Sequence, residues 1–203
     1  MHQTSDTVKP RQHGYGVIRE EGPSARRMRR RAALLLSAIS LAVILLGSAA
    51  YALNIKCPTS IGGEPCIGTD GADVMRGTDG LNSIVGLGGN DVINGLGAPD
   101  RLTGDGNAAA APGDDQLFGG ADSDDLIGGA GSDVLSGEGG DDAISADFLF
   151  NDGTDTVEGG PGRDTVNAVE GARDVIDCGP GRDRVQFDAG LDSVKRCEIK
   201  EAS

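Results

Sequence analysis

Residues 128–136 read Gly-Gly-Ala-Gly-Ser-Asp-Val-Leu-Ser, and the same nine-residue pattern recurs along the chain from Gly68 onwards. Each complete unit has glycine at positions 1, 2 and 4, a carboxylate at position 6 and an aliphatic side chain at position 8. A fixed period of this length is typical of repeat architectures, in which every unit is one small supersecondary element. About thirteen units cover residues 68–195, with insertions of six residues around 107–112, four around 147–150 and one near 170.

Two columns of the alignment carry the pattern, because only the second unit lacks an aspartate at position 6. Position 6 holds Asp73, Asn82, Asp91, Asp100, Asp115, Asp124, Asp133, Asp142, Asp155, Asp164, Asp174, Asp183 and Asp192. Position 8 holds Met75, Ile84, Ile93, Leu102, Leu117, Leu126, Leu135, Ile144, Val157, Val166, Ile176, Val185 and Val194. Twelve aspartates in thirteen aligned places are not a chance pattern.

The unit divides into a turn and a short strand. Glycine allows the left-handed or otherwise strained backbone of a tight turn. The residues that follow alternate polar and apolar side chains, as expected of a strand with one buried face. Two units close one coil of about eighteen residues, and coils stacked at the ~4.8 Å strand spacing form two parallel sheets. We therefore predict an all-β fold, a parallel β-roll or right-handed β-solenoid with the position-8 side chains as its thin core.

The same stacking brings like charges together at the turns. Position-6 carboxylates of successive coils would lie roughly 5 Å apart, and each pair costs about 0.8 kcal/mol even at the dielectric constant of water. A dication between the coils would reverse the sign of this interaction. Carboxylates and turn carbonyls offer the six to eight oxygen ligands that suit Ca²⁺, whereas Mg²⁺ demands a stricter octahedron. We expect several calcium ions in these turns.

The units resemble the glycine-rich nonapeptide of the repeats-in-toxin (RTX), or hemolysin-type, calcium-binding family. The resemblance covers residues 68–195 and implies a parallel β-roll that holds Ca²⁺ through the position-6 aspartates and main-chain carbonyls of neighbouring coils. The metal-binding residues it implies are Asp73, Asp91, Asp100, Asp115, Asp124, Asp133, Asp142, Asp155, Asp164 and Asp183. The alternative is that these aspartates only cap turns, as aspartate often does.

The repeats are degenerate near the ends, where glycines are missing before Asp174 and Asp192. We expect partial or empty sites there. Four cysteines lie in the end regions, and their positions in the nine-residue grid predict the disulfides Cys57–Cys66 and Cys178–Cys197. Pairing between the ends would require the roll to fold back on itself. A zinc site is the other alternative, but no CxxC pair is present.

The N-terminal 52 residues have the composition of a targeting segment. A basic run at 26–31 precedes an uncharged stretch, 32–53, that contains Ala50-Tyr51-Ala52. These are the parts of a secretory signal peptide, and we predict cleavage after Ala52. A retained membrane anchor is the alternative, since the stretch is long enough to span a bilayer. We expect an extension at 1–27, which is absent if translation starts at Met28, a signal peptide at 28–52, caps at 53–67 and 196–203, and the roll at 68–195.

Composition narrows the function. Residues 53–203 carry ten Lys and Arg against 29 Asp and Glu, which argues against nucleic acid as a partner. Both histidines, His2 and His13, precede the predicted cleavage site, so no Ser-His-Asp, Cys-His or zinc-hydrolase constellation can form after it. Paired aspartates could perform glycosidase-type chemistry, but every clustered pair lies on the calcium grid. We do not expect an enzyme.

The expected function is a secreted calcium-binding β-roll that folds on binding Ca²⁺ and has a structural or interaction role. The alternatives are an adhesion module that binds a surface through the faces of the roll, and an accessory module of a hydrolase. Phe118 and Ile127 are candidates for one small contact patch on such a face. The extracellular partner itself is not predicted.

Overall fold

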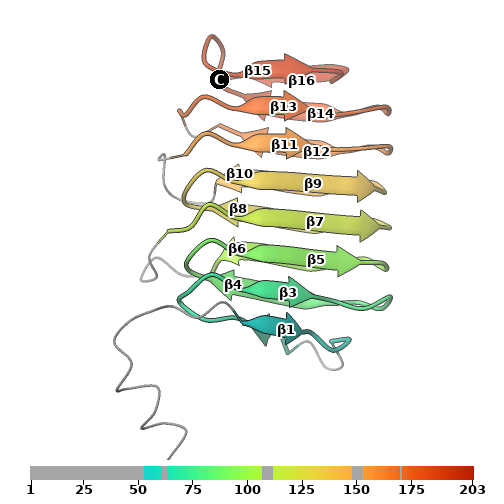
Figure 1. The fold of residues 1–203 in the computed structure, drawn as a ribbon. Coiled ribbons are helices and arrows are strands. Elements are labelled where there is room, and N and C mark those ends of the chain that lie inside the picture. The colour runs from blue at the N-terminus through green and yellow to red at the C-terminus, as the bar shows by residue number, and fades with distance from the viewer. Residues whose placement is uncertain (1–52, 61–63, 107–111, 148–152, 170) are drawn as a thin grey trace, which may run out of the picture. The chain divides into compact units, whose positions relative to one another are not determined.

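The computed structural model describes residues 53–60, 64–106, 112–147, 153–169 and 171–203. This part of the chain is all-β and contains no helix, so no helix in it could span a membrane. The predicted extension at 1–27 and signal peptide at 28–52 lie outside the described residues. The predicted parallel β-roll is confirmed (Figure 1).

Sixteen strands form two parallel sheets of eight, and successive strands alternate between the sheets. The first sheet contains β1 (Asn54–Lys56), β3 (Val74–Arg76), β5 (Val92–Leu96), β7 (Gln116–Ala121), β9 (Val134–Gly139), β11 (Thr156–Glu158), β13 (Val175–Asp177) and β15 (Ser193–Lys195). The second contains β2 (Cys66–Ile67), β4 (Ser83–Leu87), β6 (Arg101–Asp105), β8 (Asp125–Gly129), β10 (Ala143–Asp147), β12 (Thr165–Ala168), β14 (Arg184–Phe187) and β16 (Ile199–Ala202).

Each nine-residue unit supplies one turn and one strand. The thirteen units correspond to strands β3 to β15, one strand for each unit. Because a full coil needs two strands, the roll has about seven coils rather than thirteen. Strands β1, β2 and β16 extend the sheets into the end regions that were expected to act as caps.

Strand register confirms the period and the positions of the insertions. Val74 pairs with Val92, which is eighteen residues away, as the regular coil requires. Val92 pairs with Gln116 and Val134 with Thr156, so these coils are six and four residues longer. Position-8 residues still pair with one another, because each insertion falls between strands in the sequence and leaves the strands in phase.

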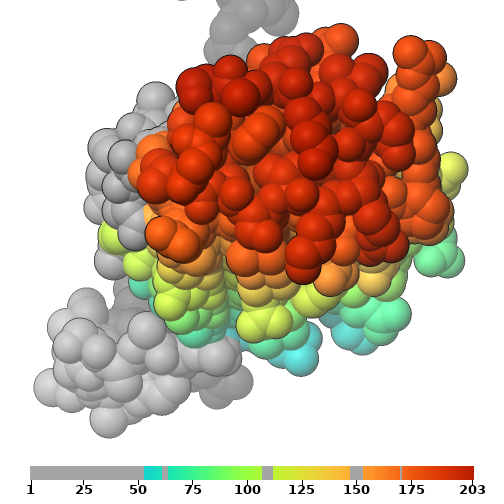
Figure 2. Space-filling model, turned by 90° about the horizontal axis from the view of Figure 1, so that it is seen from above, coloured from blue at the N-terminus to red at the C-terminus, as the bar shows by residue number. Residues whose placement is uncertain are grey.

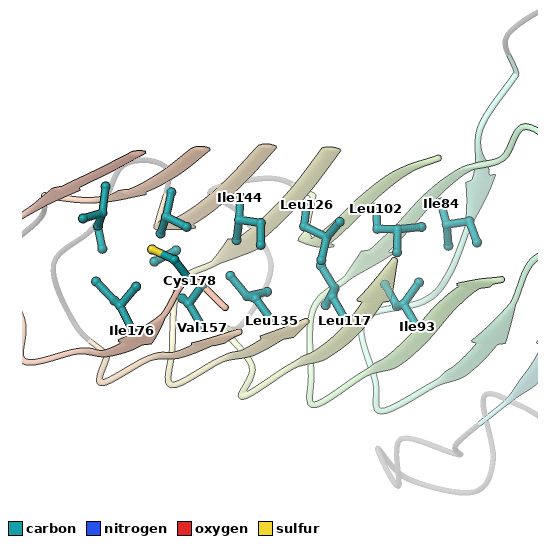
Figure 3. Packing of buried hydrophobic residues seen from close by; sticks show 14 of the residues in the cluster. Ile84, Ile93, Leu102, Leu117, Leu126, Leu135, Ile144, Val157, Ile176 and Cys178 are labelled. Atoms are coloured by element: carbon teal, nitrogen blue, oxygen red, sulfur yellow. The ribbon is translucent and has the colours of Figure 1, made fainter. Parts of the chain in front are cut away.

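The position-8 side chains form the core. They project from both sheets into the space between them and pack in two facing rows (Figure 3). All of them from Met75 to Val185 are buried, whereas Val194 in the last coil is only partly buried. The core is one side chain deep from each sheet, so every coil depends on its neighbours for burial.

A disulfide closes each end of the roll. Both predicted pairs are confirmed, with Cα atoms 5.5 Å apart in Cys57–Cys66 and 5.2 Å apart in Cys178–Cys197. Cys57, Cys178 and Cys197 are buried in the same cluster as the position-8 side chains. The last coils form the C-terminal end of the roll (Figure 2), where Cys197 is joined to Cys178 of the preceding coil.

The expected contact patch of Phe118 and Ile127 is wrong. Phe118 lies on β7 in the first sheet and Ile127 on β8 in the second. Because consecutive units alternate between the sheets, outward side chains of neighbouring units point to opposite sides of the roll. The two residues therefore cannot form one patch.

Truncating the core should destabilise the roll strongly. Leu126 is fully buried on β8, so Leu126→Ala is expected to lower the free energy of unfolding by about 2–5 kcal/mol. Val134→Ala is the matched control, because Val134 is 39% exposed on β9 and should cost less than about 1 kcal/mol. Chemical denaturation of both variants compares these costs, and equal losses would contradict the assignment of the core.

Candidate metal centre in the glycine-rich turns

The predicted metal-binding aspartates lie in two rows, one along each edge of the roll. All ten are buried, with at most 4% of the residue exposed. Asp73, Asp91, Asp115, Asp133 and Asp155 precede strands of the first sheet. Asp100, Asp124, Asp142, Asp164 and Asp183 precede strands of the second, in a row that begins with Asn82. The residues aligned at position 6 of the repeats are therefore the residues that the fold places in these two rows.

One carboxylate oxygen of each aspartate joins successive coils. The Asp73 N–H donates to Asp91 Oδ1 at 2.7 Å, and the Asp91 N–H donates to Asp115 Oδ1 at 2.8 Å. The other edge repeats the arrangement, since the Asp100 N–H donates to Asp124 Oδ1 at 2.7 Å. Asp155 takes part in the same way by accepting from the Asp133 N–H at 2.7 Å. This oxygen caps the turn below it, as the turn-capping alternative expected.

The second carboxylate oxygen is not explained by capping. Among the described residues, a set of buried Oδ2 atoms has no hydrogen-bond partner. The set consists of Asp91, Asp100, Asp115, Asp124, Asp133, Asp142, Asp164 and Asp183. A buried charged oxygen without a partner is costly, because it loses its hydration and gains nothing in return. These eight oxygens are the strongest indication of a missing positive charge.

The surroundings of the Asp91 oxygen show what it faces. A β-carbon added to Gly86, at position 1 of the same unit, would collide with Asp91 Oδ2 and lie 2.8 Å from the Gly104 carbonyl oxygen of the next coil. The carboxylate thus occupies the place of the missing side chain, beside a main-chain oxygen. Gly119 repeats this arrangement with Asp124 Oδ2 and the Gly137 oxygen. In these two turns the two oxygens occupy the space that a β-carbon at position 1 would need.

Burial raises the pKa of these carboxyl groups in the chain without ions. It raises the pKa of Asp133 to about 8, and that of Asp115 and Asp124 to about 7, with repulsion from neighbouring aspartates adding to the effect. Burial also raises the pKa of Asp91, Asp100 and Asp164 to about 6, although the backbone N–H donors oppose it. The rows therefore favour neutralisation, by protons or by a cation.

The position-6 side chains near the ends of the roll differ from these eight. Asp73 Oδ2 accepts the Thr69 N–H at 2.7 Å and the Thr69 hydroxyl at 2.9 Å. Asn82 Oδ1 accepts the Thr78 N–H at 2.8 Å, and Asp192 Oδ2 accepts the Asp188 N–H at 2.7 Å. In these turns the chain itself supplies a donor to the position-6 oxygen.

A second row of side chains at position 5 was missed in the sequence. The Ser132 N–H donates to Asp114 Oδ1 at 2.9 Å, and the Arg163 N–H donates to Asp141 Oδ1 at 2.9 Å. Asn90 accepts from the Asp114 N–H at 3.2 Å in the same way. The short polar side chains at position 5 of the central units were the signal that could have revealed this row.

The donors present suit an oxygen-seeking cation. In the described ranges no three histidine, cysteine, aspartate or glutamate side chains converge, so the ligands of a cation in these turns would have to include main-chain oxygens. Histidine is absent after residue 13 and all four cysteines are in disulfides. An all-oxygen set of carboxylate and carbonyl ligands is the set that hard cations such as Ca²⁺ prefer.

The fold and turns define a class of protein: a parallel β-solenoid with rows of buried carboxylates in glycine-rich turns. The family model described as the RTX calcium-binding nonapeptide repeat (4 copies) matches residues 67–102, 110–144 and 151–185, which is just over half of the chain. The chain belongs to this family of calcium-binding repeats. No curated protein and no solved structure matches it.

The stability of the metal-free roll should depend on pH in an unusual direction. The carboxyl groups of Asp115, Asp124 and Asp133 have folded-state pKa values of about 7 to 8, above the ordinary 3.8. A raised folded-state pKa stabilises the fold at low pH, and this contribution is lost as the pH rises through 6 to 8. In metal-free buffer, the free energy of unfolding should therefore increase from pH 8 to pH 5. A decrease over that interval would contradict this account of the buried carboxylates.

Proposed function

We propose that this protein is a secreted, non-catalytic calcium-binding β-roll whose central coils fold when Ca²⁺ binds. The ions are held by Asp91, Asp100, Asp115, Asp124, Asp133, Asp142, Asp164 and Asp183, with Asp155 as a further ligand in the same row. The observation that carries the proposal is the set of eight buried carboxylate oxygens without a hydrogen-bond donor in the described part of the chain.

Charge supports calcium rather than protons as the natural neutralising agent at neutral pH. No Lys or Arg occurs from residue 102 to residue 162, while fourteen Asp and Glu do. This segment therefore carries no positive side chain of its own to offset its carboxylates. A dication shared by a carboxylate and the carbonyls of the next coil offsets both the repulsion along the row and the lost hydration.

Folding coupled to binding follows from linkage. Each ion that binds only the folded chain stabilises it by RT ln(1 + [Ca²⁺]/Kd). Extracellular calcium modules work at Kd values of about 10⁻⁴–10⁻³ M. A chain exported through a signal peptide at 28–52 would thus stay loose in a low-calcium cytoplasm and fold outside the cell. The disulfides at both ends suit the same oxidising compartment.

The position-6 aspartates that bind calcium in this proposal leave no carboxylate pair free for catalysis. The buried aspartates that could act as acid and base are the proposed calcium ligands, and a bound dication would keep them ionised and occupied. The role of the folded roll is then structural or interactive, and its outward faces are the surfaces open to a partner.

Adjacent aspartates of β8 and its turn provide a direct test. Asp124 is buried with an unpartnered Oδ2 among the described residues, whereas the Asp125 side chain is 45% exposed beside Arg101. Asp124→Asn keeps the oxygen that accepts from the Asp100 N–H but removes the charge. Calorimetric titration should show one calcium ion fewer, or one bound much more weakly, in Asp124→Asn.

Asp125→Asn is the matched control, because it removes the same charge one residue away. Its exposed ion pair with Arg101, with Nε and Oδ2 3.3 Å apart, should contribute little. Calcium binding by this variant should equal that of the wild type. Equal calcium binding by Asp124→Asn and the wild type would show that the buried carboxylate is not a ligand.

A further inference from the structure

In ten of the thirteen repeats the second residue takes one of two backbone arrangements, and the choice follows the state of the position-6 side chain. In three turns the position-2 N–H donates to that side chain, and we call these turns closed. They are Thr69 with Asp73, Thr78 with Asn82 and Asp188 with Asp192. None of these three position-2 residues has a positive φ.

The other arrangement has a positive φ at position 2, and we call these turns open. It occurs at Leu87, Leu96, Gly120, Gly129, Glu138, Gly160 and Gly179. Their position-6 partners are seven of the eight aspartates with an unpartnered Oδ2 in the described chain. The eighth, Asp115, follows the six-residue insertion. In these ten turns the position-2 N–H therefore either donates to the side-chain oxygen at position 6 or leaves that oxygen without this donor.

Three open turns adopt this backbone without glycine. Leu87 has φ 92°, Leu96 has φ 87° and Glu138 has φ 67°. A positive φ is strained for a residue with a side chain, and for a bulky residue such as leucine it is rare. Such strain persists only where the surroundings stabilise it, and it gathers at functional sites. Local preference therefore does not explain the open turns at Leu87 and Leu96.

We propose that position 2 decides which turns take an ion: a closed turn satisfies its position-6 oxygen with the chain's own N–H and excludes Ca²⁺, whereas an open turn requires it. This inference rests on the proposed calcium binding and assigns ions to the central turns and none to Asp73, Asn82 or Asp192. Thr69 and Thr78 are the determinants at the N-terminal end, where their hydroxyls lie 2.9 Å from Asp73 Oδ2 and 3.3 Å from Asn82 Oδ1.

The closed turns also make the ends of the roll independent of calcium. At the N-terminal end, the Asn82 amide donates to the Pro58 carbonyl at 2.8 Å, and the Thr59 and Thr78 hydroxyls lie 2.9 Å apart. The Cys57–Cys66 disulfide covers the same coil. The C-terminal closed turn at Asp188 lies next to the Cys178–Cys197 disulfide in sequence. Each end thus presents a metal-free folded edge on which a central coil can form.

Exchanging the turns tests the inference. Thr69→Gly removes the hydroxyl and permits a positive φ, so the 203-residue protein with its disulfides intact should bind one more calcium ion. Leu87→Thr together with Gly88→Asp copies Thr69-Asp70 into the Asp91 turn and should bind one ion fewer.

Two control variants should leave the number of bound ions unchanged. Thr69→Ser keeps the hydroxyl, and Thr165→Val changes a side chain on the exposed face of β12. Native mass spectrometry at saturating Ca²⁺ counts the ions.

Amide exchange in the metal-free protein provides a second readout that does not need calcium. The N–H groups of Thr69, Thr78 and Asp188 should exchange slowly, and those of Leu87 and Leu96 quickly. If the wild type binds calcium but Thr69→Gly and the double variant Leu87→Thr, Gly88→Asp both bind the wild-type number of ions, the role of position 2 is overturned and the proposed function is not. A wild type that binds no calcium would overturn the proposed function and this inference together.

Discussion

The structure depends on how buried carboxylates at the edges of the roll are neutralised. Stacking at strand spacing places one aspartate in nearly every half-coil, and all of these except Asp192 are almost completely buried. One oxygen is used to hold successive coils together through a main-chain N–H, as between Asp73 and Asp91. The other is left beside a carbonyl oxygen in the central turns. The same side chain therefore ties the coils together through one oxygen and buries a second oxygen that has no hydrogen-bond donor among the described residues of the central turns.

The thin core explains why this matters. One aliphatic side chain from each half-coil fills the space between the sheets (Figure 3). With aromatic residues at 3% of the chain, little further apolar burial is possible. The hydrophobic gain of the central coils must offset both chain entropy and the charged rows. At the ends, disulfides and closed turns stabilise the chain, so the proposal gives the ends and the central coils different conditions for folding.

The nine-residue grid was sufficient to predict the strands, the core and both disulfides, because these depend only on which positions stack. It did not distinguish Asp73 from Asp91, since both are aspartates at position 6. The two turns differ in the orientation of the peptide at position 2, which is Thr69 in one and Leu87 in the other. Residue type does not predict this orientation, because a leucine with positive φ contradicts the ordinary backbone preference of leucine. The grid also missed the alternation of the sheets that separates Phe118 from Ile127, although the two-strand coil already implied it.

The central claim is that an oxygen-seeking dication of the right size completes the folding of the central coils. Far-UV circular dichroism of the oxidised protein during titration with Ca²⁺, with Mg²⁺ as the comparison, measures this most directly. The account predicts a limited β signal from the ends in chelator, a large increase in Ca²⁺ and little change in Mg²⁺. A full β spectrum in chelator at neutral pH that Ca²⁺ does not alter would show that the buried carboxylates need no metal, and would contradict the account.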